Sequence, residues 1–122
     1  MMLLMVAIGG AIGSVLRYLT SNWSTSYFGI GFPLGTLVVN VIGSFFIGLL
    51  FSLIERHTLI SSYWRPFVSV GLIGGFTTFS TFSLDTLLFI IQAEYYKACL
   101  NVVLNLSLGI LAVTIGYIIL KP

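Results

Sequence analysis

Four long runs of apolar residues, separated by short polar links, make up almost the whole sequence. The runs cover about residues 3–20, 32–54, 66–92 and 98–120. A helix needs about 20 mostly apolar residues to cross the hydrocarbon core of a bilayer, so each run is long enough to span a membrane. The pattern therefore predicts an all-α integral membrane protein, with four transmembrane helices in a single domain over residues 1–122.

The links between the runs are short and carry residues typical of a membrane–water boundary. The first link, Ser21 to Gly31, contains Trp23 and Tyr27 as expected interfacial anchors. Thr58 to Ser62 are expected to form the middle loop and Glu94 to Lys97 the last one.

The composition agrees with burial in lipid. Hydrophobic residues make up 58% of the chain and charged residues only 7%, whereas soluble domains carry about 25% charged residues. So little charge cannot cover a surface that faces water. The formal net charge of +2, without a basic run, argues against a nucleic-acid surface, and the single Cys99 cannot form an internal disulfide.

The positive charges specify the orientation in the membrane only weakly. Four spans place Arg56, Arg65 and Lys121 on one side, and Arg17 and Lys97 on the other. The positive-inside rule orients a protein through an excess of Lys and Arg on the cytoplasmic side, and here the excess is one residue. Two interpretations stay open: one charge is enough to fix the orientation, or copies insert both ways and pair antiparallel.

The third run is interrupted near its middle by the stretch from Gly74 to Thr78. Glycine lowers helix propensity by about 1 kcal/mol relative to alanine, and threonine hydroxyls can bond backbone groups that a break sets free. We therefore expect a helix broken at mid-membrane, with released carbonyls that can bind a cation. A simpler interpretation stays open, because Gly71 and Gly75 have the small-xxx-small spacing that permits close helix packing.

Phe79 and Phe82 follow the interruption three residues apart, so they share one helix face. The edge of a phenyl ring carries partial positive charge and can approach an anion, but phenylalanines in membrane helices more commonly pack or face lipid. Asp85, one turn further on, can cap, pair or line a vestibule. The hydroxyls around the two rings are those of Thr78, Ser80, Thr81 and Ser83.

Polar side chains also recur every four residues on the second and fourth runs. They are Thr36, Asn40 and Ser44 on the second run, and Asn101 and Asn105, with Ser107 nearby, on the fourth. Their N–H and O–H groups fit a polar track through the protein, although buried amides in membranes also simply bond neighbouring helices. Arg17 either snorkels to the interface or supplies positive potential at a pore mouth.

The sequence does not indicate an enzyme. It has no His, Cys, Asp and Glu set with metal-ligand spacing, no Gly-rich phosphate loop and no Ser–His–Asp set. The single histidine, His57, is expected to lie solvated in a loop.

Three sets of motifs together point to a known family. They are Gly9–Gly13 with Arg17-Tyr18; Gly35-Thr36 with Val39-Asn40 and Gly43–Phe45; and Gly71 with Gly74–Phe82. These motifs resemble the Fluc (CrcB) family of fluoride channels, and the resemblance covers all four runs. The stretch from Gly74 to Phe82 is much more specific than a GxxxG spacing.

The resemblance implies an antiparallel, dual-topology homodimer in a bacterial inner membrane, which exports fluoride passively through two pores and so relieves fluoride toxicity. The fluoride pathway that it implies comprises Asn40, Phe79, Phe82, Thr78, Thr81, Asn105, Ser107 and Arg17. It also implies that the backbone carbonyls of Gly74 and Thr77, from both subunits, hold a structural sodium ion (Na+) at the dimer centre. The expected partners are fluoride, membrane lipid and a second copy of the chain.

Two other functions share some of these features. Small multidrug transporters have a similar length, four spans and dual topology, but they carry an intramembrane glutamate in the first span, whereas this chain has no acidic residue before Glu55. An accessory helix bundle within a larger complex would use the glycine motifs for assembly alone, and would conduct no ions when purified.

Overall fold

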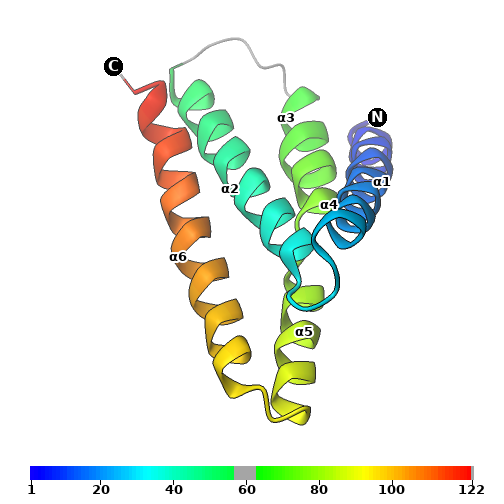
Figure 1. The fold of residues 1–122 in the computed structure, drawn as a ribbon. Coiled ribbons are helices and arrows are strands. Elements are labelled where there is room, and N and C mark those ends of the chain that lie inside the picture. Colours follow the sequence, from blue (N-terminus) through cyan, green and yellow to red (C-terminus); the bar gives the residue numbers. More distant parts are fainter. Residues whose placement is uncertain (57–62, 122) are drawn as a thin grey trace.

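The computed structural model describes residues 1–56 and 63–121, and this part of the chain is helical apart from short links and the two extended residues Thr77 and Thr78. The first two long helices are α1 (Met2–Phe28) and α2 (Leu34–Glu55), and the last is α6 (Tyr95–Ile119). Between them lies a segmented third span, Trp64–Ile91. Figure 1 shows both termini at the same end of the bundle, as four alternating spans require. The expected Thr58–Ser62 loop and His57 lie outside the described residues.

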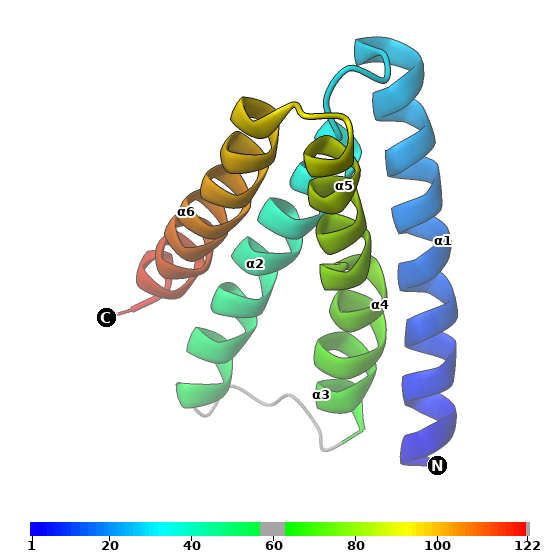
Figure 2. The ribbon, with the colours of Figure 1, turned by 90° about the horizontal axis from the view of Figure 1, so that it is seen from below.

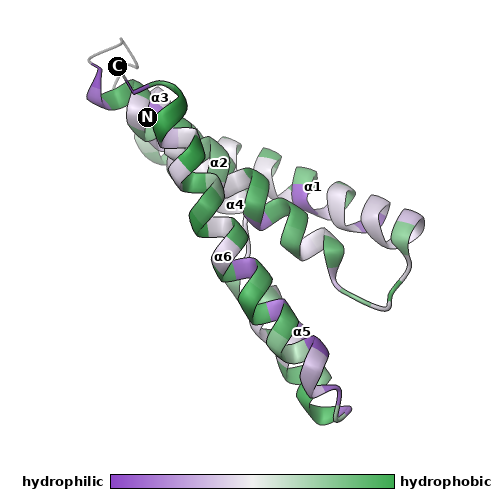
Figure 3. Ribbon diagram, turned by 60° about the vertical axis from the view of Figure 1, so that its left-hand side comes forward, coloured by the Kyte–Doolittle hydropathy of each residue, from purple (hydrophilic) through white to green (hydrophobic). Residues whose placement is uncertain are grey.

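Within the described residues, four helical segments are long and apolar enough to cross a membrane, which confirms the main prediction from the hydropathy pattern. Their outer faces expose large hydrophobic side chains such as Leu3, Ile110 and Ile119, which water would not favour but lipid does. Hydrophobic residues run along all the helices, and only a few strongly hydrophilic positions interrupt them (Figure 3). The chain is therefore a multi-pass membrane protein.

The third span is broken, as the sequence predicts. It consists of α3 (Trp64–Pro66), a π-helical stretch η1 (Phe67–Ile73), α4 (Gly74–Phe76) and α5 (Phe79–Ile91). Between α4 and α5, Thr77 (φ −81°, ψ 160°) and Thr78 (φ −151°, ψ 121°) are extended. The break thus falls on the two threonines, whereas Gly74 and Gly75 stay helical, which corrects the expectation that the glycines interrupt the helix.

Gly71 and Gly75, before the break, serve helix packing. A Cβ at Gly71 would lie 2.8 Å from the carbonyl oxygen of Val6, and one at Gly75 would lie 2.8 Å from that of Gly10. Such distances leave no room for a side chain, so α1 and the third span approach backbone to backbone. The close-packing interpretation of Gly71 and Gly75 is therefore correct, and it holds together with the break.

The other half of the bundle is the α2–α6 pair. Gly48 of α2 faces the backbone of α6 at Val113, and Gly116 of α6 faces the backbone of α2 at Phe45, both too closely for a Cβ. Figure 2 shows α2 beside α6, with the third span between this pair and α1. α2 also contacts the third span, and the break itself is bonded to α1 through Arg17 and to α2 through Asn40.

Two links are shorter than expected. The first, predicted from Ser21, begins only after Phe28, because α1 continues and the start of α2 packs on it: a Cβ at Gly35 would lie 2.8 Å from the Cα of Ser21. Trp23 and Tyr27 are therefore helical and stack with ring centroids 5.7 Å apart. The last link is a tight turn around Ala93 (φ 59°), so that α6 already begins at Tyr95.

Candidate functional site

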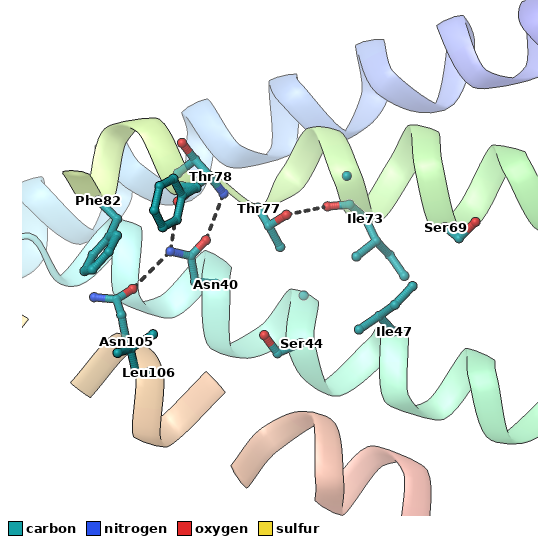
Figure 4. A pocket seen from close by; sticks show the side chains of 13 residues that line it. Asn40, Ser44, Ile47, Ser69, Ile73, Thr77, Thr78, Phe82, Asn105 and Leu106 are labelled. Carbon is teal, nitrogen blue, oxygen red and sulfur yellow. Dashed lines mark hydrogen bonds between the residues drawn. The ribbon is translucent and has the colours of Figure 1, made fainter. Parts of the chain in front are cut away.

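The broken backbone of the third span is held by the side-chain amide of Asn40 on α2 (Figure 4). The Asn40 Oδ1 accepts a hydrogen bond from the Thr78 N–H at 2.8 Å, and its Nδ2 donates to the Thr78 carbonyl at 3.0 Å. One amide thus satisfies both polar groups of an extended residue in mid-membrane. Without partners these groups would cost several kcal/mol in hydrocarbon, so the Asn40 side chain makes the break possible.

The Thr78 side chain begins the second half of the span. Its Oγ1 accepts from the backbone N–H of Thr81 at 3.2 Å, the bond by which an N-cap threonine starts a helix. The same hydroxyl donates to the Thr81 Oγ1 at 3.1 Å. Thr78 is buried and Thr81 is exposed. Local sequence therefore explains why α5 starts at Phe79.

The break diverts the hydrogen-bond donors from two backbone carbonyls. In a continuous helix the Thr78 N–H would donate to the Gly74 carbonyl and the Thr81 N–H to the Thr77 carbonyl, but both donate to side chains instead. The Thr77 carbonyl accepts from the Arg17 Nη1 of α1 at 3.3 Å. The half-buried Arg17 therefore contacts the break itself.

A pocket of about 410 Å³ opens beside the break. It is lined by Asn40, Gly43, Ser44, Ile47, Ser69, Ile73, Gly74, Thr77, Thr78, Phe79, Phe82, Asn105 and Leu106. All of these lining residues are uncharged. The pocket therefore offers an ion neutral amide, hydroxyl and backbone groups, together with two phenyl rings.

The two phenylalanines differ in their surroundings. Phe82 is 9% exposed and packed into the pocket wall, whereas Phe79 is 77% exposed. Their ring centroids are 5.7 Å apart, at an interplanar angle of 55°. Both line the pocket, but in a single chain only Phe82 is enclosed by protein.

The three residues of α6 that were expected on the polar track lie in different surroundings. Asn105 lines the pocket, and its Oδ1 accepts from the Asn40 Nδ2 at 3.0 Å. Behind it lies Asn101, which is fully buried and donates to the Thr86 Oγ1 at 3.0 Å. Ser107 is exposed, lies outside the pocket lining and donates to the carbonyl of Val103 on its own helix at 2.6 Å.

Asp85 of the third span has a polar partner on α2. The Thr36 Oγ1 donates to the Asp85 Oδ2 at 3.2 Å, so Asp85 pairs with the first residue of the polar stripe on α2. Of the other two stripe residues, Asn40 holds the break, and Ser44 lines the pocket. Two of the three stripe residues, Thr36 and Asn40, therefore bond to the third span, and Ser44 lies at the pocket beside it.

Sequence reasoning missed two features of this site. It treated Asn40 as a donor without foreseeing that its amide would hold the Thr78 backbone, and it did not foresee the contact between Arg17 and Thr77. These partners are separated by 38 and 60 residues. No local pattern signals such contacts; only the polar character of each residue within an apolar run was available.

Comparisons with known proteins identify the family of this chain. A family described as "CrcB-like protein, Camphor Resistance (CrcB)" matches residues 4–117. A protein of Shewanella sp. (strain W3-18-1) named "Fluoride-specific ion channel FluC" is 52% identical over 113 residues, covering 93% of this chain and 90% of the relative.

A protein of the same name from Vibrio vulnificus (strain YJ016) is 47% identical over 116 residues, which cover 95% of this chain and 92% of the relative. A protein of this name from Shewanella oneidensis is 50% identical over 114 residues, which cover 93% of this chain and 91% of the relative. These names describe ion channels and not enzymes. Since the family match and the relatives extend over almost the whole sequence, the chain belongs to the CrcB/FluC family of fluoride-specific ion channels.

Proposed function

We propose that this protein is a fluoride-selective channel, which lets fluoride leave the cell passively across a bacterial inner membrane and so relieves fluoride toxicity. The observation that carries the proposal is the identity of 47–52% to proteins named fluoride-specific ion channels, over nearly the full chain. The pocket beside the broken helix supports it, because it joins neutral donors from three spans within a membrane protein.

The chemistry of the pocket suits a small, strongly hydrated anion. Such an ion crosses an apolar region only if other donors replace its water. The Asn40 amide and the Thr78 hydroxyl are donors of this kind, and the edge of Phe82 adds partial positive charge. Since conduction requires binding that is strong enough for the ion to enter and weak enough for it to leave, uncharged donors suit the task better than a fixed cation.

The proposed pathway runs along the pocket past Asn40, Thr78, Phe82 and Asn105. Phe79 belongs to it as well, and its large exposed area is then covered by a second subunit. Thr81 and Arg17 act at the break, through Thr78 and Thr77 respectively. Ser107 is proposed for the pathway by family resemblance alone, since it lies outside the pocket of a single chain.

The working unit that we propose is an antiparallel, dual-topology homodimer. The near balance of positive charge between the two sides of the bundle supports insertion in both directions. The exposed Phe79 and Gly74 beside the break support a second copy packed on this face.

In the same dimer we propose a structural sodium ion, held by the Gly74 and Thr77 carbonyls of both subunits. The residues fit such an ion, because carbonyl oxygens are hard, neutral ligands and because the helical donors of both carbonyls are diverted to side chains. The contact from Arg17 leaves a second lone pair on the Thr77 oxygen. Bound sodium would supply positive potential and join the two broken helices.

The proposal is tested by fluoride efflux from liposomes that contain only this protein, with chloride efflux as the control. We expect flux of fluoride and little flux of chloride. A folded, reconstituted protein without fluoride-selective flux would refute the proposed function and would favour the accessory-bundle alternative.

A further inference from the structure

A chain of hydrogen bonds runs from the pocket into the protein behind it. It passes from Asn40 to Asn105, then to Asn101, and ends on Thr86 of α5. Asn40 and Asn105 line the pocket, whereas Asn101 and Thr86 do not. Asn101 is 0% exposed, so it cannot touch an ion in the pocket, and its role must be exerted through its neighbours.

The backbone fixes the direction of this chain at its pocket end. The Thr78 N–H can only donate, so the Asn40 Oδ1 must face it, and the Asn40 Nδ2 is turned toward the Thr78 carbonyl and the Asn105 side chain. Both hydrogens of the Asn40 amide are therefore aimed at oxygen acceptors.

The backbone fixes the same direction at the inner end. The Phe82 carbonyl can only accept, and the Thr86 hydroxyl donates to it at 2.9 Å. The Thr86 Oγ1 is then the acceptor for the Asn101 Nδ2 at 3.0 Å, which turns the Asn101 Oδ1 toward Asn105.

Asn101 consequently orients the Asn105 amide from the side away from the pocket. Its Nδ2 donates to the Asn101 backbone carbonyl at 2.9 Å and to the Asn101 Oδ1 at 3.1 Å. With both amide hydrogens held in this way, its Oδ1 is the group that faces Asn40. The two ends of this chain of hydrogen bonds thus impose the same polarity at Asn105. If the Asn105 amide were flipped, its N–H would face the N–H of Asn40.

This polarity matters for an anion that binds at Asn40. The Asn105 oxygen already occupies one N–H of Asn40, so the ion must displace it, and one hydrogen bond is exchanged for another without leaving the N–H unpaired. Such an exchange weakens net binding of the ion and favours its release. If Asn105 were free to turn, it would present its own N–H to the ion and hold it more tightly.

We propose that Asn101 and Thr86 are positioning residues, which hold Asn105 so that its oxygen competes with the conducted anion for the Asn40 amide. This inference rests on the proposed function, since it assigns a task to residues behind the fluoride pathway. Neither residue contacts the ion; both act through the orientation of Asn105.

The test compares Asn101→Leu and Thr86→Val with the wild type in liposomes, measuring fluoride flux over a range of fluoride concentrations. Asn101→Leu removes one of the two hydrogen bonds that hold the Asn105 Nδ2 and keeps the other, to the backbone carbonyl of residue 101. The weaker hold on the competing oxygen should lower the half-saturating fluoride concentration by up to about fivefold, the equilibrium factor of one neutral hydrogen bond, and should also lower the maximal flux. Thr86→Ser keeps the hydroxyl and should restore wild-type values. A lower flux with an unchanged or raised half-saturating concentration would mean that the residues are only structural, and would overturn the proposal.

A matched control is Thr114→Val, which also removes a hydroxyl bonded to the carbonyl four residues earlier, at 2.7 Å on Ile110, but on an exposed face of α6. A second readout does not depend on conduction. In Thr86→Val the side-chain ¹⁵N amide resonances of Asn105 should shift, although the side chains of Thr86 and Asn105 are not bonded to each other. In Thr114→Val these resonances should not shift. If Asn101→Leu does not fold, the comparison of Thr86→Val with Thr86→Ser decides the question. Absence of fluoride flux in the wild type refutes the proposed function, whereas unmoved Asn105 resonances refute the positioning role.

Discussion

Replacing Asn40 by leucine is the most direct test of how the break is held. Leucine has a similar size but cannot form the three hydrogen bonds of the Asn40 amide, two to the Thr78 backbone at 2.8 and 3.0 Å and one to the Asn105 Oδ1 at 3.0 Å. Asn40→Leu therefore leaves one N–H and two carbonyl oxygens without their partner, all of them at the pocket in mid-membrane.

Two estimates bracket the cost of this change. Side-chain hydrogen bonds between membrane helices average about 0.6 kcal/mol each, so three of them amount to about 2 kcal/mol. Stranded buried groups cost about 1–3 kcal/mol each, which would raise the total to as much as about 9 kcal/mol. The lower value should apply, because Thr78 and Asn105 line a pocket that can admit water and because the Thr78 N–H can return to the Gly74 carbonyl by closing the break.

The free energy of unfolding is measured by titration with denaturing detergent, followed by circular dichroism. We expect Asn40→Leu to be about 2 kcal/mol less stable than the wild type, and hydrogen exchange of the Thr78 amide to change. Ser44→Ala is the matched control, since Ser44 lies one turn further along α2 and lines the same pocket. If Asn40→Leu were as stable as this control and the Thr78 amide exchanged as before, the Asn40 amide would not be what holds the break.

Three further predictions concern the aromatic pair, the helix contacts and the cation. Phe79→Ile and Phe82→Ile should each reduce fluoride flux while dimers still form on gel filtration, because an aliphatic side chain has no electropositive edge; unchanged flux in both would remove the rings from the pathway. Gly48→Ala should destabilise the α2–α6 contact by about 1–3 kcal/mol in the same detergent titration, whereas Gly10→Ala, whose Cβ would meet nothing within 4 Å, should not. Exchange of sodium for a larger cation during purification should alter flux or assembly, and no response after demonstrated exchange would count against the sodium site.

The sequence was most informative where one physical effect dominates. Lipid selects long apolar runs, so the four spans could be recognised from hydropathy alone. The interruption could be placed within five residues, Gly74 to Thr78, because glycines and threonines are unfavourable in a helix. Its position on Thr77 and Thr78 could not be predicted, since it depends on Asn40, which lies 38 residues away.

The remaining errors came from contacts between distant segments. The polar residues after Ser21 looked like a link, but the helix continues to Phe28 because the start of α2 packs against it. The π-helical stretch Phe67–Ile73 carries no local signal, since its apolar residues suit an α-helix equally well. For the candidate site, the residue types were predicted, whereas the direction of each hydrogen bond required the fold.

The direction of those bonds decides what an amide can do for an ion. A pathway built from asparagines can present either N–H or oxygen, because the two ends of a carboxamide have the same shape and opposite polarity. In this protein each amide is bonded to a group whose polarity is fixed by the backbone: Asn40 to the Thr78 N–H, and Asn101, through Thr86, to the Phe82 carbonyl. The broken helix therefore supplies more than diverted carbonyls, since Thr78 at the break and Phe82 in α5 provide the two reference points that orient the polar network.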